Sequence, residues 1–367
     1  MTTTDVTVIE ETRKSEKPRA KRHPRLAVDK AALKKLRLVA VAYSHVKSAW
    51  FPTPEAYEAE VEVEQRAKDV VLALKKLGVK AKAYRADRYF MAKLLVDQPD
   101  LVLNLVDTLR GSDALQTSIP GALELTGIPY TGAGMRGLVV GNDRNLVKEL
   151  FDANNIPTPD FQFVTRRGTP IREDLGLPLI VKLNESGGSV GIDNAAVKES
   201  YEDAQQQATF LIETYKMPVV VERFIEGPEI TAVAFDDGVR THVFCGEKVF
   251  KESEDRKYLF TSFESYNDAD CYHYTEADPE VVEAVTGHVV RAFEVLRCRD
   301  YAKFDVRIDA TTWIPYFTDA NPNTAFGPGP GLPMTEVLAL HGVKFQKVLA
   351  SLMSKHARRI HSPAKTL

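Results

Sequence analysis

Residues 178–192 read PLIVKLNESGGSVGI, and the strongest structural signal of the chain lies here. A short apolar run that ends in Lys182 predicts a strand, and a loop with three glycines and two serines joins it to another strand. Glycine lets backbone N–H groups converge on an anion, serine hydroxyls add donors, and the lysine adds a positive charge. The loop is long for a tight hairpin, and the GxxxxGK[ST] order of a P-loop is absent. We therefore favour a loop that covers phosphate groups over a simple hairpin.

Strands and helices alternate before this loop. Apolar runs at Leu36–Tyr43, Val79–Ala86 and Leu101–Val106 predict buried strands. Between the first two, Glu55–Leu77 has apolar residues at helical spacing, and Gly78 is placed to end that helix. Strands that alternate with helices imply right-handed crossovers, so we expect a parallel sheet in an α/β domain.

The rest of the chain continues this α/β pattern. We expect helices over Asn142–Ala153, about Lys198–Tyr215, Pro279–Leu296 and about Met334–Ser354, and strands at Val219–Glu222, Ile230–Phe235, Thr241–Phe244, Ala302–Ile308 and Trp313–Thr318. An irregular polar segment runs from Lys251 to Tyr274. We expect four regions: a tail over 1–35, an N-terminal α/β domain over 36–135, a central subdomain over 136–218 and a C-terminal domain over 219–360.

Composition places the chain among ordinary globular proteins. It has 367 residues, 44% of them hydrophobic and 27% charged, and a net charge of -3. These values exclude a largely disordered chain and argue against nucleic acid as a specific partner. No apolar run approaches the ~20 residues that a membrane span needs, so we expect no membrane contact. The three cysteines, Cys245, Cys271 and Cys298, form no CxxC pair and fit a reduced, cytoplasmic compartment.

The first 35 residues differ from the rest. They hold ten Lys or Arg against five Asp or Glu, so they carry +5 while the remainder carries -8. Apolar residues are few here and lack a period, which predicts a disordered basic tail that ends in a short helix at Ala31–Lys35. A basic tail can contact acidic surfaces, but we favour a solvated extension of minor function.

A second motif lies at residues 219–230, VVVERFIEGPEI. An apolar strand runs into a hinge that contains Phe224 and Ile225, and another strand follows. Backbone groups beside these side chains can pair with the edge of a purine, and Glu229 can accept two ribose hydroxyls. Taken alone, the motif is better explained as two strands with a turn at Gly227 and Pro228.

A third motif offers ligands for a metal ion. Asp319 and Asn321 are two residues apart on one predicted strand, so both side chains point to the same face. Asp305 lies on the preceding strand and can face them. Carboxylate and amide oxygens are hard ligands that suit Mg²⁺, and no His or Cys cluster competes for zinc. Caps of surface strands are the alternative, but acids inside apolar strands need a partner.

Together the three motifs resemble the ATP-grasp superfamily, and within it the D-alanine–D-alanine ligases. The resemblance covers about Leu101 to the last helix, with its closest stretches at Leu123–Gly134, Asn142–Pro157, Pro178–Ile192, Val219–Thr231 and Ala302–Asn321. It implies an α/β ATP-grasp fold, with an N-terminal parallel α/β domain and two α+β subdomains that sandwich a nucleotide. It also implies ATP and Mg²⁺ (or Mn²⁺) as cofactors.

The resemblance further implies roles for individual residues. The implied nucleotide contacts are Arg144 and Lys182 at the phosphates, Gly187, Gly188, Ser189 and Val190 in the loop, Glu222, Phe224 and Ile225 at the adenine hinge, and Glu229 at the ribose. The implied magnesium ligands are Asp305, Asp319 and Asn321, of which the middle one is commonly Glu in the family. The implied catalytic residues are Lys303, Ser189 and Tyr266. Lys303 stands where the family has an arginine, and lysine keeps the charge but loses the bidentate fork.

The substrate half departs from the family. The segment after the first strand, Ala42–Lys47, lacks the family's acidic element for the first substrate's amine. A His-Gly and Gly-Glu-Asp-Gly stretch is replaced by Val106–Asp113, which brings in Arg110 and favours an anionic group on the first substrate. Alternatively, Glu60, Asp107 or Asp113 binds the amine from a shifted loop. Ser265 replaces a loop lysine, so Lys251 or Lys257 has to reach the γ-phosphate.

We therefore expect an ATP-dependent carboxylate–amine ligase that acts through an acyl phosphate on small-molecule substrates. Its substrates are expected to be an amino acid or small peptide other than two D-alanines. The alternatives are a true D-alanine–D-alanine ligase and a nucleotide-binding module without catalysis. A homodimer is an option that the resemblance leaves open.

Overall fold

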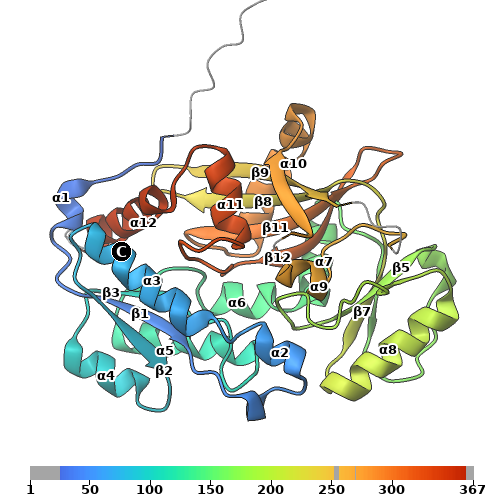
Figure 1. The fold of residues 1–367 in the computed structure, drawn as a ribbon, viewed down its shortest axis with the longest axis horizontal. Coiled ribbons are helices and arrows are strands. Elements are labelled where there is room, and N and C mark those ends of the chain that lie inside the picture. The colour runs from blue at the N-terminus through green and yellow to red at the C-terminus, as the bar shows by residue number, and fades with distance from the viewer. Residues whose placement is uncertain (1–24, 252–255, 269, 361–367) are drawn as a thin grey trace, which may run out of the picture.

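Three sheets and their covering helices make up the computed structural model, which describes residues 25–251, 256–268 and 270–360 (Figure 1). We call them the first, second and third lobe in chain order. Within these residues no helix is long and apolar enough to cross a membrane.

The first lobe is built on a parallel sheet with the order β2-β1-β3. Its strands are β1 (Val39–Ser44), β2 (Ala81–Ala86) and β3 (Leu101–Leu105), and β1 is buried along its whole length. Helices α3 (Val63–Lys76) and α4 (Phe90–Asp97) form the two crossovers. The expected parallel α/β arrangement is thus present, because apolar strand runs alternate with helices.

The helix expected over 55–77 is two helices. Helix α2 covers Pro54–Glu58, and α3 begins only at Val63. Thr53 caps α2 by accepting a hydrogen bond from the Ala56 N–H, and Pro54 occupies the first helical position. The turn between the two helices brings Glu60 to the central cleft described below.

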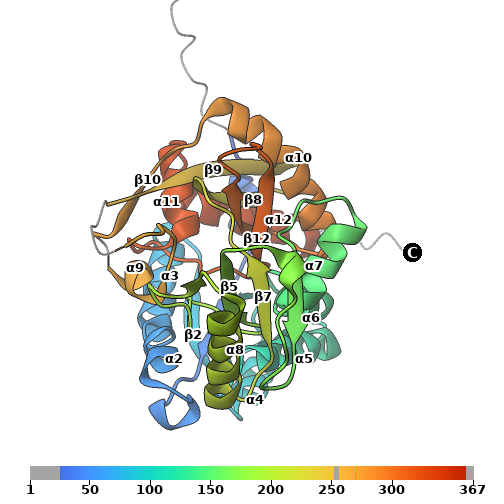
Figure 2. The same ribbon diagram turned by 90° about the vertical axis from the view of Figure 1, so that its right-hand side faces the viewer.

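The second lobe is an antiparallel sheet with the order β4-β7-β5-β6. Its strands are β4 (Phe161–Val164), β5 (Leu179–Leu183), β6 (Val197–Lys198) and β7 (Val219–Arg223), and α8 (Tyr201–Tyr215) packs on one face (Figure 2). The expected boundary at residue 218 is wrong, because β7 pairs with β4 and β5 and so belongs to this sheet.

The third lobe has the order β10-β9-β8-β11-β12. All neighbouring strands are antiparallel: β8 (Glu229–Asp236), β9 (Thr241–Phe250), β10 (Tyr272–Glu276), β11 (Tyr301–Ile308) and β12 (Pro315–Asn321). The described part of the polar segment 251–274 is therefore less irregular than expected. It holds the start of β10 and helix α9 (Phe263–Asn267).

Helices cover both faces of the third sheet. Helix α10 (Pro279–Val295) packs with alternate β8 residues such as Ala232, whereas Val233 faces the core that contains α11 (Pro333–Leu340). Helix α7 (Arg144–Ala153), expected in the central subdomain, also packs into the α10 side through Val147 and Phe151. Its apolar stripe therefore belongs to the third lobe.

The C-terminal helix links the third lobe to the first. The helix expected over 334–354 divides into α11 and α12 (Phe345–Ile360), with Gly342 in the left-handed region (φ 70°) between them. Leu349, Leu352 and Met353 of α12 share one hydrophobic core with strands β1 and β3. The remaining helices are α1 (Lys30–Leu33), α5 (Ser118–Thr126) and α6 (Met135–Gly141), and short 3₁₀ turns lie at Ser48–Trp50, Ala114–Thr117 and Glu173–Leu175.

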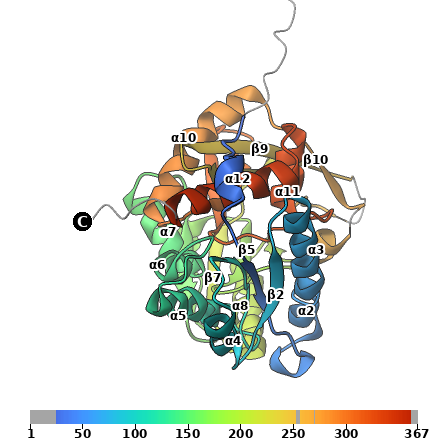
Figure 3. The same ribbon diagram turned by 90° about the vertical axis from the view of Figure 1, so that its left-hand side faces the viewer.

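The structure contradicts the last part of the disordered tail that the sequence predicts over residues 1–35. Residues 1–24 lie outside the described residues, but residues 25–35 are part of the fold. Leu26 and Leu33 are buried in the core shared by the first and third lobes, and α1 packs against α12 (Figure 3). The Ala27 N–H also donates to the Asp237 carboxylate at 2.9 Å. A few well-placed leucines anchor this segment despite its sparse apolar content.

Candidate functional site

The three lobes meet around one cleft of about 1610 Å³, a volume that includes the solvent at its open mouth. Its lining includes the following residues predicted from the sequence: Arg144, Lys182, Gly187, Gly188, Ser189, Glu222, Phe224, Ile225, Glu229, Lys303, Asp305, Asp319 and Asn321. Two of the predicted residues, Val190 and Tyr266, are absent from this set. The Val190 side chain is buried in the core of the second lobe, away from the cleft. Tyr266 lies in helix α9, but its side chain is outside the part of the chain that the structure describes.

The glycine-rich loop spans residues 184–196 between β5 and β6, which is too long for a tight hairpin. Gly188, Ser189 and Gly191 all adopt positive φ angles, a conformation that glycine adopts most easily. The Gly187 N–H donates to Asp113 at 2.9 Å, and the Gly191 N–H donates to Glu55 at 2.7 Å. The loop amides therefore already bind anionic groups, which is the property that a phosphate-binding loop requires.

A buried carboxylate, Glu222, lies between two lysines. Lys182 donates a hydrogen bond to one of its oxygens, and Lys148 forms an ion pair with the other. Burial raises the pKa of Glu222, but the two positive charges outweigh that effect and hold it below its ordinary value. Burial lowers the pKa of Lys148, partly offset by Glu222. The sequence reasoning missed Lys148, although it follows Arg144 by four residues and so shares its face of α7.

Arg144 connects α7 to two other elements of the cleft. Its guanidinium donates to the Leu183 carbonyl at 2.6 Å and to the Asp319 carboxylate at 2.8 Å. Asp143 caps the helix by accepting from the Leu146 N–H. The second cation predicted at the phosphates is thus fixed between the end of β5 and a predicted metal ligand.

The predicted metal ligands lie together on the neighbouring strands β11 and β12. Asp305 and Asp319 are direct partners across β11 and β12, and a bulge follows Asp305. Asp305 forms an ion pair with Lys303, and Asn321 has a buried amide nitrogen without a hydrogen-bond partner. Burial raises the pKa of Asp319, but the charges of Arg144, Lys182 and Lys303 lower it overall. Two carboxylates and the amide oxygen of Asn321 are oxygen donors of the kind that suits a hard cation such as Mg²⁺.

Among the described residues no group of three or more His, Cys, Asp and Glu side chains is arranged to hold a metal ion. The predicted set contains only two carboxylates, so it needs other oxygen donors to complete a magnesium shell.

Acidic side chains of the first lobe line the part of the cleft where the sequence predicts the first substrate. Glu60, Asp107 and Asp113 line it together with Arg66, which donates to Asp107 at 2.7 Å. Burial raises the pKa of Asp113 to about 7, and nearby Asp107 adds to that shift while the bond from Gly187 opposes it. Burial also raises the pKa of Glu60 and of Asp107. The closely spaced carboxyls therefore hold protons more tightly than free acids do.

The arginine that lines this side of the cleft is Arg66 and not the expected Arg110. Arg110 is exposed and absent from the cleft lining, and its backbone adopts a positive φ of 55°. Arg66 from helix α3 lines the cleft instead. Ser265, which replaces a family lysine, is buried and forms the capping box of α9 with Ser262. Neither Lys251 nor Lys257 lines the cleft, and Lys257 pairs with Glu199 on the surface.

Comparisons with known proteins find relatives among the D-alanine–D-alanine ligases. The sequence profile of a family described as "D-ala D-ala ligase C-terminus" matches residues 150–354. A D-alanine–D-alanine ligase from Paracidovorax citrulli is 29% identical over 255 residues, 69% of this chain and 73% of that protein. One from Polaromonas sp. is 28% identical over 296 residues, 78% of this chain and 84% of that protein.

Solved structures show the same overall arrangement. The D-alanine–D-alanine ligase from Bacillus anthracis, crystallised in complex with ATP, has a TM-score of 0.67 at 19% identity and covers 88% of this chain and 98% of its own. The VanG D-Ala:D-Ser ligase from Enterococcus faecalis has a TM-score of 0.65 at 16% identity, with coverage of 88% and 100%.

Proposed function

Because the chain belongs to the D-alanine–D-alanine ligase family, whose C-terminal profile matches residues 150–354, we propose that it joins a carboxylate to an amine through an acyl phosphate. The chain has the ATP-grasp fold that its sequence resembles. It is an ATP-dependent ligase that forms a C–N bond. The intermediate, the substrates and the residue roles below are our proposal.

The observation that supports this proposal most directly is the convergence of positive charge at the loop. Arg144, Lys182 and Lys303 come from α7, β5 and β11, yet all three line the cleft beside the glycine-rich loop. A triphosphate is strongly anionic, and charged donors in a partly dehydrated cleft bind it well. We therefore assign the ATP phosphates to this end and the adenine to the hinge at Phe224 and Ile225.

In the proposed reaction an oxygen of the substrate carboxylate attacks the γ-phosphorus of ATP. The bond from that phosphorus to the β,γ-bridging oxygen breaks, and ADP leaves with the electron pair. The nitrogen lone pair of the amine then attacks the acyl carbon, phosphate leaves, and the extra proton of the amine passes to solvent. Lys303 stabilises the negative charge that develops on the acyl oxygen, and Arg144 and Lys182 orient the phosphates.

We assign Mg²⁺ to Asp305, Asp319 and Asn321. When bound there, the ion would neutralise phosphate charge, with phosphate and water oxygens as its other ligands. Lys303 forms an ion pair with Asp305, and Arg144 forms one with Asp319. The same ion pairs keep both cations close to the reacting phosphate.

For the substrates we propose an amino acid or a small peptide other than two D-alanines. The chain lacks the family's acidic element after the first strand, and Glu60 comes instead from the turn between α2 and α3. Glu60, Asp107 and Asp113 give an ammonium group several acceptors, and Arg66 beside Asp107 can bind a carboxylate of the same molecule. This combination fits an amino acid or a small peptide.

Phosphate release from ATP tests the proposal. Purified full-length protein is incubated with ATP, Mg²⁺ and a panel of amino acids, dipeptides and hydroxy acids, and products are identified by mass spectrometry. We expect phosphate release only with one specific pair of carboxylate and amine substrates. The Lys182→Ala variant is expected to release none. Formation of D-alanyl-D-alanine at about 1 s⁻¹ or faster would favour a true D-alanine–D-alanine ligase. No turnover with any pair would favour the module without catalysis.

A homodimer stays a prediction of the family resemblance. Light scattering on the eluate of a sizing column measures it.

A further inference from the structure

Helix α2 belongs to the first lobe but packs on the second lobe, close to α8 (Figure 1). The side chains of Ala56 and of Ala59, which follows the helix, contact the hydrophobic core of the second lobe. Glu55 adds polar contacts from the same helix. Its Oε1 accepts a hydrogen bond from the Gly191 N–H at 2.7 Å, and its Oε2 accepts one from the Tyr215 hydroxyl of α8 at 3.2 Å. The first lobe is thus attached to the glycine-rich loop through one carboxylate.

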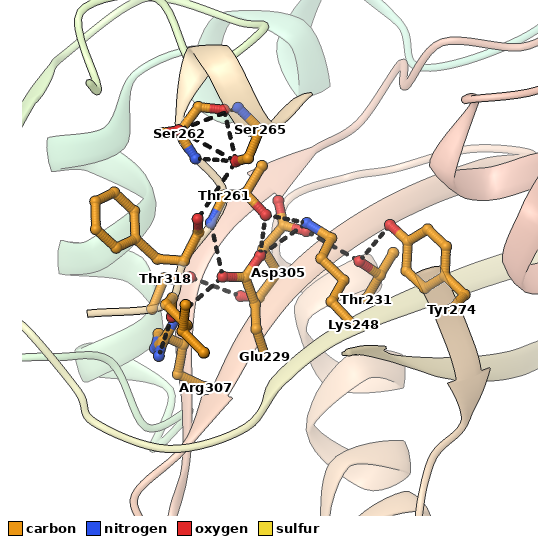
Figure 4. A network of polar contacts seen from close by, with 12 residues as sticks. Glu229, Thr231, Lys248, Thr261, Ser262, Ser265, Tyr274, Asp305, Arg307 and Thr318 are labelled. Carbon is orange, nitrogen blue, oxygen red and sulfur yellow. Dashed lines mark hydrogen bonds and ion pairs between the residues drawn. The ribbon is translucent and has the colours of Figure 1, made fainter. Parts of the chain in front are cut away.

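The next residues of the same loop are attached to the start of helix α9. The Phe263 N–H donates to the Ile192 carbonyl at 2.8 Å, and the Ser262 hydroxyl donates to the side-chain oxygen of Asn194 at 2.7 Å. The Ser262 N–H donates to the Ser265 hydroxyl at 2.7 Å, so the start of α9 is itself fixed (Figure 4). The second half of the loop is therefore held by two helices, α2 and α9, that come from distant parts of the chain.

Glu55 contacts the loop from outside the cleft. Neither Glu55 nor Gly191 lines the cleft, whereas Gly187, Gly188 and Ser189 do. Among the described residues, the N–H groups of Gly188 and Ser189 donate to no protein acceptor, so both are left to bind an anion in the cleft. The bond to Glu55 fixes the backbone only two residues after Ser189, and it therefore limits how far these two N–H groups can move.

We propose that Glu55 is a positioning residue that holds the glycine-rich loop over the phosphates of ATP through the Gly191 N–H. This inference rests on the proposed function and deepens it, because it assigns a fixing contact of the phosphate loop to the first lobe. A hydrogen bond from an amide to a carboxylate is stronger than one between neutral groups. One such bond can therefore restrict a loop whose glycines otherwise permit many backbone conformations.

The same short segment also reaches the substrate part of the cleft. Glu60 follows the end of α2 by two residues and lines the cleft, and its Oε2 accepts from the Thr108 hydroxyl at 3.3 Å. Residues 55–60 thus contact the phosphate loop at one end and line the substrate part of the cleft at the other. The position of the loop is therefore tied to the lobe that supplies the substrate contacts, and the adenine hinge takes no part in this link.

Binding of ATP and of adenosine to full-length variants tests the inference. The dissociation constants are measured by calorimetry in the presence of Mg²⁺. Glu55→Ala removes the acceptor for the Gly191 N–H, so we expect the affinity for ATP to fall about tenfold. The affinity for adenosine, which has no phosphate, should stay within about threefold of the wild-type value. Glu55→Gln keeps an acceptor oxygen for Gly191, and we expect its ATP affinity to stay within about threefold of the wild type. Glu58→Ala, at an exposed position of the same helix, is the matched control and should change neither affinity.

Several results would overturn the inference. An unchanged ATP affinity in Glu55→Ala would mean that the loop does not depend on this contact, and a higher one would mean that the carboxylate competes with phosphate. An equal loss of adenosine affinity would mean that the substitution disturbs the whole cleft. Equal losses in Glu55→Ala and Glu55→Gln would mean that the charge matters and not the hydrogen bond. In each of these cases the wild type still binds ATP. If the wild type binds neither ATP nor adenosine, the proposed function fails and the inference fails with it.

Discussion

Lys182 and Glu222 form a buried ion pair between strands β5 and β7, and a second lysine, Lys148, reaches the same carboxylate from helix α7. One negative charge thus faces two positive charges in a place that water hardly enters. Lys182 can turn toward phosphate without leaving Glu222 unpaired, because Lys148 remains beside it.

Removing Lys148 should therefore weaken nucleotide binding. In Lys148→Met, Glu222 keeps Lys182 as its only cation, so the release of Lys182 toward phosphate becomes more costly. We expect the dissociation constant for ATP to rise about tenfold, and stability to fall by about 1–3 kcal/mol in urea unfolding. Lys347→Met on the exposed side of α12 is the control. An unchanged ATP affinity would contradict this account of Lys148.

Loss of a predicted metal ligand should stop turnover and spare the fold. Asp319→Asn keeps the shape of the side chain but removes a charged oxygen donor and weakens the bond from Arg144. We expect phosphate release to fall at least about 100-fold and the magnesium concentration for half-maximal activity to rise. EDTA should abolish the wild-type activity, and Mg²⁺ should restore it. Full turnover in Asp319→Asn, against the exposed control Asp152→Asn, would disprove the metal assignment.

The substrate-side acids should make stability depend on pH. The folded state raises the pKa of Asp113 to about 7 from an ordinary value near 3.8, so it binds an extra proton between those pH values. This contribution to stability is complete below about pH 4 and is lost as the pH rises through 7. The Asp113→Asn side chain cannot ionise. Between pH 5 and pH 8 the unfolding free energy of the wild type should therefore fall by about 2–3 kcal/mol more than that of the variant. Identical slopes in urea unfolding would contradict the shift, and Asp152→Asn is the control.

The docked segment before β1 should matter for stability. Leu33 is 6% exposed and packs in the core shared by the first and third lobes. Leu33→Ala should lower the unfolding free energy by about 2–4 kcal/mol, because it leaves a cavity in that core. Removal of residues 1–30 should also destabilise the protein, since it deletes buried Leu26 and the hydrogen bond from Ala27. A deletion that left the melting temperature unchanged would mean that this contact carries no stability.

Sequence patterns predicted the strands and the positions of the cleft residues better than the contacts between them. Short apolar runs such as residues 101–105 can only be buried strands or helix cores, and their length and flanking residues identify strands. The spacing of Asp319 and Asn321 sufficed to place both on one face. The sequence does not reveal the register of β11 against β12. It could therefore only suggest that Asp305 faces Asp319 and Asn321.

The contacts that the sequence did not reveal come from residues distant along the chain. Lys248 and Arg307 meet at Glu229 because β9, β8 and β11 lie side by side, and no local pattern encodes that meeting. Arg110 is exposed and does not line the cleft, although Asp107 and Asp113 on either side of it do, and no sequence pattern distinguishes the three. The sequence did not predict helix α4, because its buried apolar residues, Phe90 and Leu94, are too few to show a helical periodicity.

Helix α12 completes a core that begins some 300 residues earlier, with strand β1, and this order has a consequence for how the protein folds. During synthesis the apolar surface of the first sheet is not fully covered until helix α12, the last helix of the described chain, has been made. We therefore expect the nascent first lobe to expose valine and leucine side chains until α12 has been made, and to be prone to aggregation during that time. Once α12 has docked, the first and third lobes should melt in a single cooperative transition.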